Sequence, residues 1–158
     1  MTCFRGFSLI EILIVFILLA ILSGLGLSFL PALLKKNQRE VIADEISQAI
    51  QYAKLETLTR QRVLTLAPIA DDADWSKGMR LYEDNKAHRY TKESTVIREW
   101  HWHSPGTRVT WRGFESAVYL RFTPELNPRS ANGRFVLQCA GLSPITLVIN
   151  RLAHVKRA

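Results

Sequence analysis

The chain has 158 residues, a length that suits one domain with an attached segment. Hydrophobic residues make up 47% of it, but many of them lie in the first third, and the part after residue 35 has the composition of an ordinary soluble protein. This distribution excludes a protein with several membrane spans. The net charge of +7 makes the chain basic, which favours anionic partners.

The first segment is apolar and long. No charged residue occurs from Ile12 to Leu34, and as a helix this run is roughly 35 Å long, enough to cross a bilayer with some tilt. A cleaved secretory signal is the alternative, but its apolar core would be shorter and would not begin with an acid. We therefore predict a membrane helix over residues 7–34, with Glu11 as a costly charge at its head that needs a partner.

The next segment predicts an amphipathic helix. Apolar residues recur at spacings of three and four over residues 37–62, and charged or polar residues fill the positions between them. No glycine or proline follows Pro31 before residue 62. We therefore expect one long helix from residue 7 to about residue 60, kinked near residues 26–31 by Pro31, whose second half packs on the remainder of the chain.

From residue 62 onward the pattern is that of short β-strands. Runs rich in β-branched and aromatic residues cover 62–66, 78–82, 96–103, 108–111, 118–122, 134–139 and 145–150. Asn132-Gly133 indicates a β-hairpin, and Ser143-Pro144 indicates a break between strands. Short antiparallel strands packed on an amphipathic helix predict an α+β domain.

Histidines and tryptophans alternate along residues 96–103. His101 and His103 share one face of the predicted strand, but a zinc site needs a third ligand and the other histidines are distant in sequence, so a surface strand is favoured and no metal is predicted. The four tryptophans are expected to anchor the core. Alternatively, together with nearby arginines, they would stack on single-stranded nucleic acid or form an adhesive face. The tryptophans are Trp75, Trp100, Trp102 and Trp111, and the arginines Arg98, Arg108 and Arg112.

No residue pattern indicates catalysis or a bound cofactor, and Cys139, in an apolar stretch, is expected to be a small buried hydrophobic residue. The end of the chain is distinctly basic. No acidic residue follows Glu125, whereas five basic residues do: Arg129, Arg134, Arg151, Lys156 and Arg157. This asymmetry indicates an anionic partner such as nucleic acid, lipid headgroups or an acidic protein surface, although a basic surface that only aids solubility is the commoner case.

The N-terminus, Gly6-Phe7-Ser8-Leu9-Ile10-Glu11 followed by an apolar helix, resembles the class III signal of type IV pilins and type II secretion pseudopilins. The resemblance implies that residues 1–6 are a leader, that a prepilin peptidase cleaves between Gly6 and Phe7, and that the new amine of Phe7 is methylated. It also implies that Glu11 pairs with the N-terminal amine of a neighbouring subunit during assembly. The subunit would sit in the inner membrane by one span, with residues 63–158 as a periplasmic β-rich domain behind the helix of residues 35–62.

The globular part resembles the GspH/FimT family of minor pilins. The blocks that carry the resemblance are residues 55–66, 75–84, 120–124, 133–139 and 147–151. It implies a long N-terminal helix packed against two antiparallel β-sheets, and a role as a minor subunit of a filament built from other pilins or pseudopilins.

Some FimT-type members bind DNA through a C-terminal Gly-Arg-x-Arg pattern. Here the matching stretch is Ala153-His154-Val155-Lys156, which keeps basic character without the two arginines. Two readings remain open: a minor pilin that binds DNA for uptake, and a type II secretion pseudopilin with no nucleic-acid role. The candidate DNA-binding residues are Arg134, Arg151, His154, Lys156 and Arg157.

Overall fold

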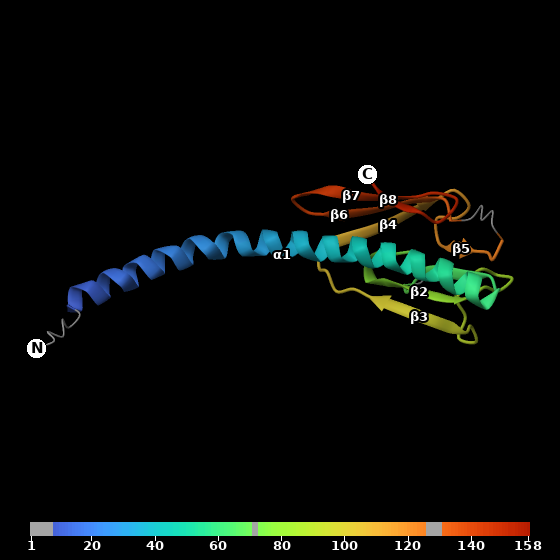
Figure 1. Cartoon of the computed structure of the whole chain (residues 1–158), viewed down its shortest axis with the longest axis horizontal. Helices are drawn as coiled ribbons and strands as arrows, with labels where there is room; N and C mark the ends of the chain where they lie inside the picture. Colours follow the sequence, from blue (N-terminus) through green and yellow to red (C-terminus); the bar gives the residue numbers. More distant parts are fainter. Residues whose placement is uncertain (1–7, 71–72, 126–130) are drawn as a thin grey trace, which may run out of the picture. The chain divides into compact units, whose positions relative to one another are not determined.

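The structure is a computed structural model that describes residues 8–70, 73–125 and 131–158, with the backbone but not the side chains of residues 25–30. It contains one long helix, two four-stranded sheets and a short 3₁₀ helix. The chain divides into two compact units, Met1–Lys36 and Asn37–Ala158. Figure 1 gives the order of the elements along the chain.

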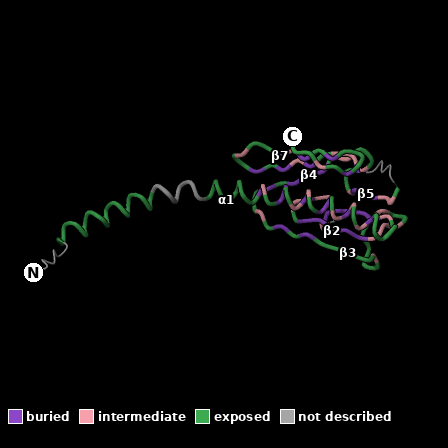
Figure 2. Tube along the Cα trace, viewed as in Figure 1, coloured by how far each residue is buried: buried purple, intermediate pink, exposed green. Residues whose placement is uncertain are grey.

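Helix α1 spans Leu9–Arg60 and passes through Pro31, so the predicted continuous helix is confirmed. In the first unit, every described side chain of this helix is exposed, as Figure 2 shows in green. In the part of the chain that the structure describes, no helix has the length and apolarity needed to span a membrane.

In the second unit, helix α1 buries one face. The buried apolar residues recur at helical spacing, as the amphipathic pattern predicts: Ile42, Ala43, Ile46, Ala49, Ile50 and Ala53. This half of the helix lies between the two sheets (Figure 1). Tyr52 packs edge-on against Trp100 of one sheet, with ring centroids 5.8 Å apart, while Arg39 donates a hydrogen bond to the carbonyl of Ser143 in the other.

The first sheet has the order β3-β2-β1-β5, and all of its neighbours are antiparallel. Its strands are β1 (Leu64–Pro68), β2 (Gly78–Glu83), β3 (Val96–His101) and β5 (Leu120–Phe122). The 3₁₀ helix η1 (Trp75–Lys77) leads into β2. Each of these strands lies within or overlaps a predicted run, so the sequence pattern located the strands correctly although it did not pair them.

The second sheet has the antiparallel order β4-β6-β7-β8. Its strands are β4 (Thr107–Gly113), β6 (Gly133–Cys139), β7 (Leu142–Ile149) and β8 (Val155–Arg157). Two sheets on a long helix confirm the α+β, pilin-like class. Strand β8 was not predicted, because its three residues are too few to show an alternating pattern.

Two turn predictions were wrong. Ser143-Pro144 is no break between strands, because both residues lie within β7 near its start, where proline is tolerated. Asn132-Gly133 makes no hairpin either, because β6 pairs with β4 and β7 and not with the preceding strand β5. Gly133 is instead needed for close packing, since a Cβ there would lie 2.4 Å from the ring of Trp111 and 2.5 Å from the Arg112 carbonyl oxygen.

The core fills the space between the helix and the inner faces of both sheets. All four tryptophans are buried in it, and Trp75 and Trp111 each pack against the ring of Phe135. The prediction that the tryptophans anchor the core is therefore confirmed, and the alternatives of a tryptophan stacking surface or adhesive face are wrong. Cys139 is buried and free of any disulfide, as predicted.

Candidate functional site

Charge is distributed unequally between the two sheets. The strands of the second sheet contain five basic residues and no acidic residue; the basic residues are Arg108, Arg112, Arg134, Lys156 and Arg157. In the strands of the first sheet, two of the three arginines lie near acidic residues, since Arg80 is 3.3 Å from Glu99 and Arg121 is 3.0 Å from Glu115. The third, Arg98, lies over the rings of Tyr52 and Trp100. The strands of the second sheet therefore carry the larger excess of positive charge.

The register of the second sheet aligns its basic residues in a row. Arg112 lies opposite Arg134, Arg134 opposite Val148, and Val148 opposite Lys156. Side chains alternate between the two faces of a strand, and the neighbouring positions that point inward, such as Trp111, Phe135 and Leu147, are buried in the core. The row therefore lies on the outer, solvent-exposed face.

We call this surface the basic face and define it by Arg108, Arg112, Arg134 and Lys156, which are all exposed. Like charges directly opposite one another, such as Arg112 and Arg134, destabilise a sheet. Among the described residues no acid forms an ion pair with any member of this face. A bound anion would offset this repulsion, so the arrangement is suited to an anionic ligand.

The turn between β7 and β8 extends the positive charge at one end of the sheet. The side-chain oxygen of Asn150 accepts hydrogen bonds from the backbone N–H groups of Leu152 and His154, at 2.9 and 2.8 Å. Lys54 of helix α1 donates to the carbonyl of Leu152 at 2.9 Å. These bonds fix a turn that leaves Arg151 and His154 exposed.

Ala153 in this turn is buried and has φ 56°, in the left-handed region that favours glycine. It stands where the resemblance to DNA-binding members places a glycine. Ala153 thus adopts a left-handed conformation although it has a side chain, and Gln51 donates to its carbonyl at 3.3 Å.

The predicted DNA-binding residues do not form one cluster. Arg134 and Lys156 lie on the basic face, and Arg151 and His154 lie on the adjoining turn. Arg157 lies opposite the inward-facing Leu147 and forms an ion pair with Glu40 of helix α1. Arg157 therefore joins the sheet to the helix. Arg129, the other basic residue near the end of the chain, lies outside the described residues.

Sequence reasoning missed Arg108 and Arg112 as members of this site and assigned them to the tryptophans instead. Their spacing of four along β4 places both on the outer face, while Val109 and Trp111 point inward. The alternation was visible in the sequence, but the position of Arg112 opposite Arg134 depends on the pairing of β4 with β6, which the sequence does not show.

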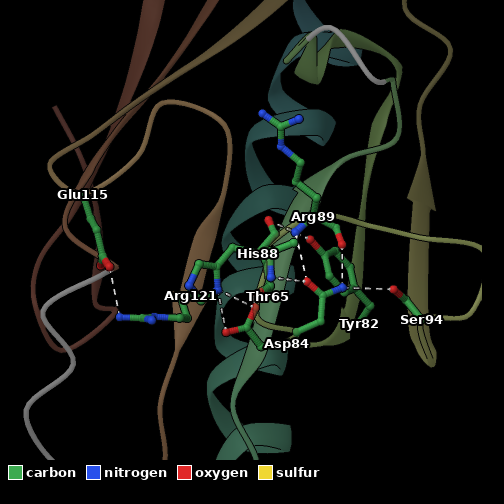
Figure 3. A network of polar contacts seen from close by, with 10 residues as sticks. Thr65, Tyr82, Asp84, His88, Arg89, Ser94, Glu115 and Arg121 are labelled. Carbon is green, nitrogen blue, oxygen red and sulfur yellow. Dashed lines mark hydrogen bonds and ion pairs between the residues drawn. The ribbon is translucent and has the colours of Figure 1, made fainter.

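The outer side of the first sheet is held by a polar network that Figure 3 shows. Asp84 accepts a hydrogen bond from Thr65 at 2.8 Å and lies 2.9 Å from Nδ1 of His88. Burial raises the pKa of the nearby Tyr82 to about 12, so this phenol is neutral at physiological pH. His101 and His103 are exposed and His101 lies 3.2 Å from Glu99; the described residues contain no group of three potential metal ligands.

The residues predicted for processing and assembly lie at the other end of the chain. Gly6 and Phe7 are outside the described residues. Glu11 lies in the first turn of helix α1, exposed, and its backbone N–H donates to the Ser8 carbonyl at 3.0 Å. Its carboxylate is therefore available to a group from another molecule.

Comparisons with known proteins agree with this architecture. The family model described as "Type II transport protein GspH" matches residues 43–153, and the model "Prokaryotic N-terminal methylation motif" matches residues 1–27. No curated protein sequence matches the chain.

Two crystal structures of the type IV minor pilin FimU from Pseudomonas aeruginosa share the fold. The first has a TM-score of 0.62 at 17% identity and covers 78% of this chain and 90% of FimU. The second has a TM-score of 0.54 at 18% identity and covers 75% and 91%. At this level of identity the likeness concerns the fold.

Proposed function

Given that the chain belongs to the GspH family of type II transport proteins, we propose that it is processed, anchored in the inner membrane and assembled as a minor subunit of a type IV pilus or type II secretion pseudopilus. The match of residues 1–27 to a methylation motif carries this proposal. Family and fold are those of structural subunits rather than enzymes.

In this proposal a prepilin peptidase removes residues 1–6 and the amine of Phe7 is methylated. Residues 7–34 hold the subunit in the inner membrane, and residues 63–158, behind the helix of residues 35–62, face the periplasm. The uncharged run from Ile12 to Leu34 supports the anchor. After assembly the same helix packs among those of other pilins or pseudopilins.

Glu11 is the residue proposed to direct assembly. A carboxylate in an apolar environment gains most from an opposite charge at contact distance. Staggered helices would bring the Phe7 amine of one subunit to Glu11 of the next. Glu11 is exposed and at the head of its helix, which supports this role.

The test replaces Glu11 with alanine in the full-length protein. We expect cleavage of the leader to continue, shown by the mass of the membrane-extracted protein, while the amount recovered in sheared filaments falls several-fold. Glu11→Gln should behave like Glu11→Ala, because it keeps the size but not the charge. Normal filament recovery of both variants would refute the pairing.

Binding of DNA through the basic face is the second proposed function, and the unbalanced charge of the second sheet supports it. Phosphate neutralisation releases counterions, so binding should weaken steeply with salt. A plot of log affinity against log salt concentration has a negative slope, and replacing Arg112, Arg134 and Lys156 with alanine should make it shallower by roughly three. The measurement is a DNA mobility shift with the full chain in nonionic detergent.

The matched control replaces Arg60, Arg62 and Lys86, three exposed basic residues outside the second sheet, and changes the net charge equally. It should leave the shift nearly unchanged. If the unmodified protein gives no shift at low salt, or if both triple variants lose affinity equally, the basic face has no specific role. The pseudopilin without a nucleic-acid role would then be the better description.

A further inference from the structure

An exposed aromatic ring stands beside the basic face. Phe114 directly follows β4 and has 87% of its surface exposed. Its backbone N–H donates to the carbonyl of Asn132 at 2.9 Å. This bond closes the last pair of the β4–β6 ladder, Gly113 with Gly133, and holds the backbone of Phe114 next to Asn132.

The ladder determines which face Phe114 occupies. Side chains alternate along a strand, and the N–H of Phe114 still points toward β6, so its side chain follows on the face of Arg112 and Arg108. Asn132, whose carbonyl accepts this bond, precedes Arg134 by two residues. The ring is thus one same-face step from the Arg112–Arg134 pair, where diagonal neighbours are still within reach of aromatic and long side chains.

Such exposure is unusual for a large ring in the unit Asn37–Ala158. The four tryptophans are buried, and Tyr90 is covered on one side by the guanidinium of Arg80, 3.9 Å from the ring centroid. Phe114 takes part in none of the ring or cation contacts found among the described residues. Its face is therefore open to a flat ligand group.

An open aromatic ring next to a row of phosphate-binding cations is the combination by which proteins hold single strands: the cations follow the backbone and the ring stacks on a base. We propose that Phe114 is a stacking platform for a base of single-stranded nucleic acid whose phosphates lie on Arg112, Arg134 and Lys156. This inference rests on the proposed DNA binding by the basic face. It adds that the face prefers single-stranded to double-stranded nucleic acid. Bases in a duplex are already stacked and do not reach the ring.

The experiment uses the full chain in nonionic detergent and fluorescence anisotropy of three labelled probes of equal length: oligothymidylate, an abasic oligonucleotide and a DNA duplex. Phe114→Ala should weaken binding of oligothymidylate by about tenfold, within the range for loss of one stacked base. Binding of the abasic strand and of the duplex should not change. Phe114→Trp should bind oligothymidylate at least as tightly as the unmodified protein.

Leu55→Ala is the matched control, because Leu55 is an exposed apolar residue that belongs to helix α1 and not to the second sheet. It should affect none of the probes. An unchanged tryptophan emission spectrum will show that Phe114→Ala keeps its fold. If Phe114→Ala loses affinity equally for all three probes, or loses none for oligothymidylate, the proposal is overturned.

Two further outcomes separate the possible failures. If the unmodified protein binds none of the probes, the proposed DNA binding itself fails and the stacking fails with it. If the duplex and abasic strand bind through the basic face but Phe114→Ala has no effect on oligothymidylate, only the stacking is wrong. Reduced filament incorporation of Phe114→Ala in that case would assign the ring to a contact with a neighbouring subunit.

Discussion

At the scale of single residues, the two glycines that flank β6 have different reasons to be glycine. Gly133 has no room for a side chain, because an added Cβ would lie 2.4 Å from the Trp111 ring and 2.5 Å from a backbone oxygen. Gly141, in the turn from β6 to β7, has open space around it but φ 81°. One position is limited by packing and the other by backbone conformation.

We therefore expect Gly133→Ala to lower the free energy of unfolding by about 2–3 kcal/mol, as for overpacked cores. Gly141→Ala should cost about 1 kcal/mol, the cost of a left-handed residue that is not glycine. Urea unfolding followed by tryptophan fluorescence measures both. Equal losses would mean that the Trp111 ring and the Arg112 backbone both shift at little cost.

At the scale of elements, the short 3₁₀ helix η1 supports the free edge of the sheet that carries the basic face. The hydroxyl of Ser76 accepts a hydrogen bond from the backbone N–H of Val109 in β4, at 3.0 Å. Asp74 caps η1 by accepting from the Ser76 backbone N–H at 2.9 Å. Hydrogen bonding by Ser76 lowers the pKa of the Asp74 carboxyl.

A carboxyl whose pKa is lower in the folded state stabilises the fold above its unfolded pKa, and this contribution is lost as the pH falls through the folded value. Asp74→Ala should cost about 1 kcal/mol at pH 7, as for other lost caps. The difference from the unmodified protein should shrink below about pH 3.9, where the unfolded carboxyl protonates.

The control is Asp74→Asn, which keeps an acceptor without a charge and should cost less than Asp74→Ala at pH 7. Urea unfolding at a series of pH values measures both variants. If the loss of unfolding free energy in Asp74→Ala stays constant down to the lowest pH at which the protein folds, the charge of Asp74 contributes nothing to stability.

At the scale of the whole molecule, every residue of the hydrophobic core lies in the unit Asn37–Ala158. The described side chains of residues 8–36 are exposed and add nothing to that core. A fragment of residues 37–158 should therefore fold alone, with a melting temperature within a few degrees of the full chain. Circular dichroism and a blue-shifted tryptophan emission will report this, because all four tryptophans are buried; emission typical of water-exposed tryptophan would contradict it.

The prediction of individual elements succeeded where the signal was local. The apolar spacing from Ile42 to Ala53 identified the packed face of helix α1, because a helix repeats every 3.6 residues and its partners are close in sequence. It failed where pairing was distant. Asn132-Gly133 has the composition of a hairpin turn, yet Gly133 pairs with Gly113 of β4 and with Ile149 of β7.

The sequence alone therefore determined the family, the α+β class, the helix and the location of seven of the eight strands, because these depend on composition, local periodicity and short motifs. It also identified the basic end of the chain. Only the tertiary structure decided which cations act together. Strand register places Arg112, Arg134 and Lys156, from separate parts of the chain, in one row across the sheet. Arg157 instead forms an ion pair with Glu40. Register arises from contacts between distant segments, which no local pattern in the chain encodes.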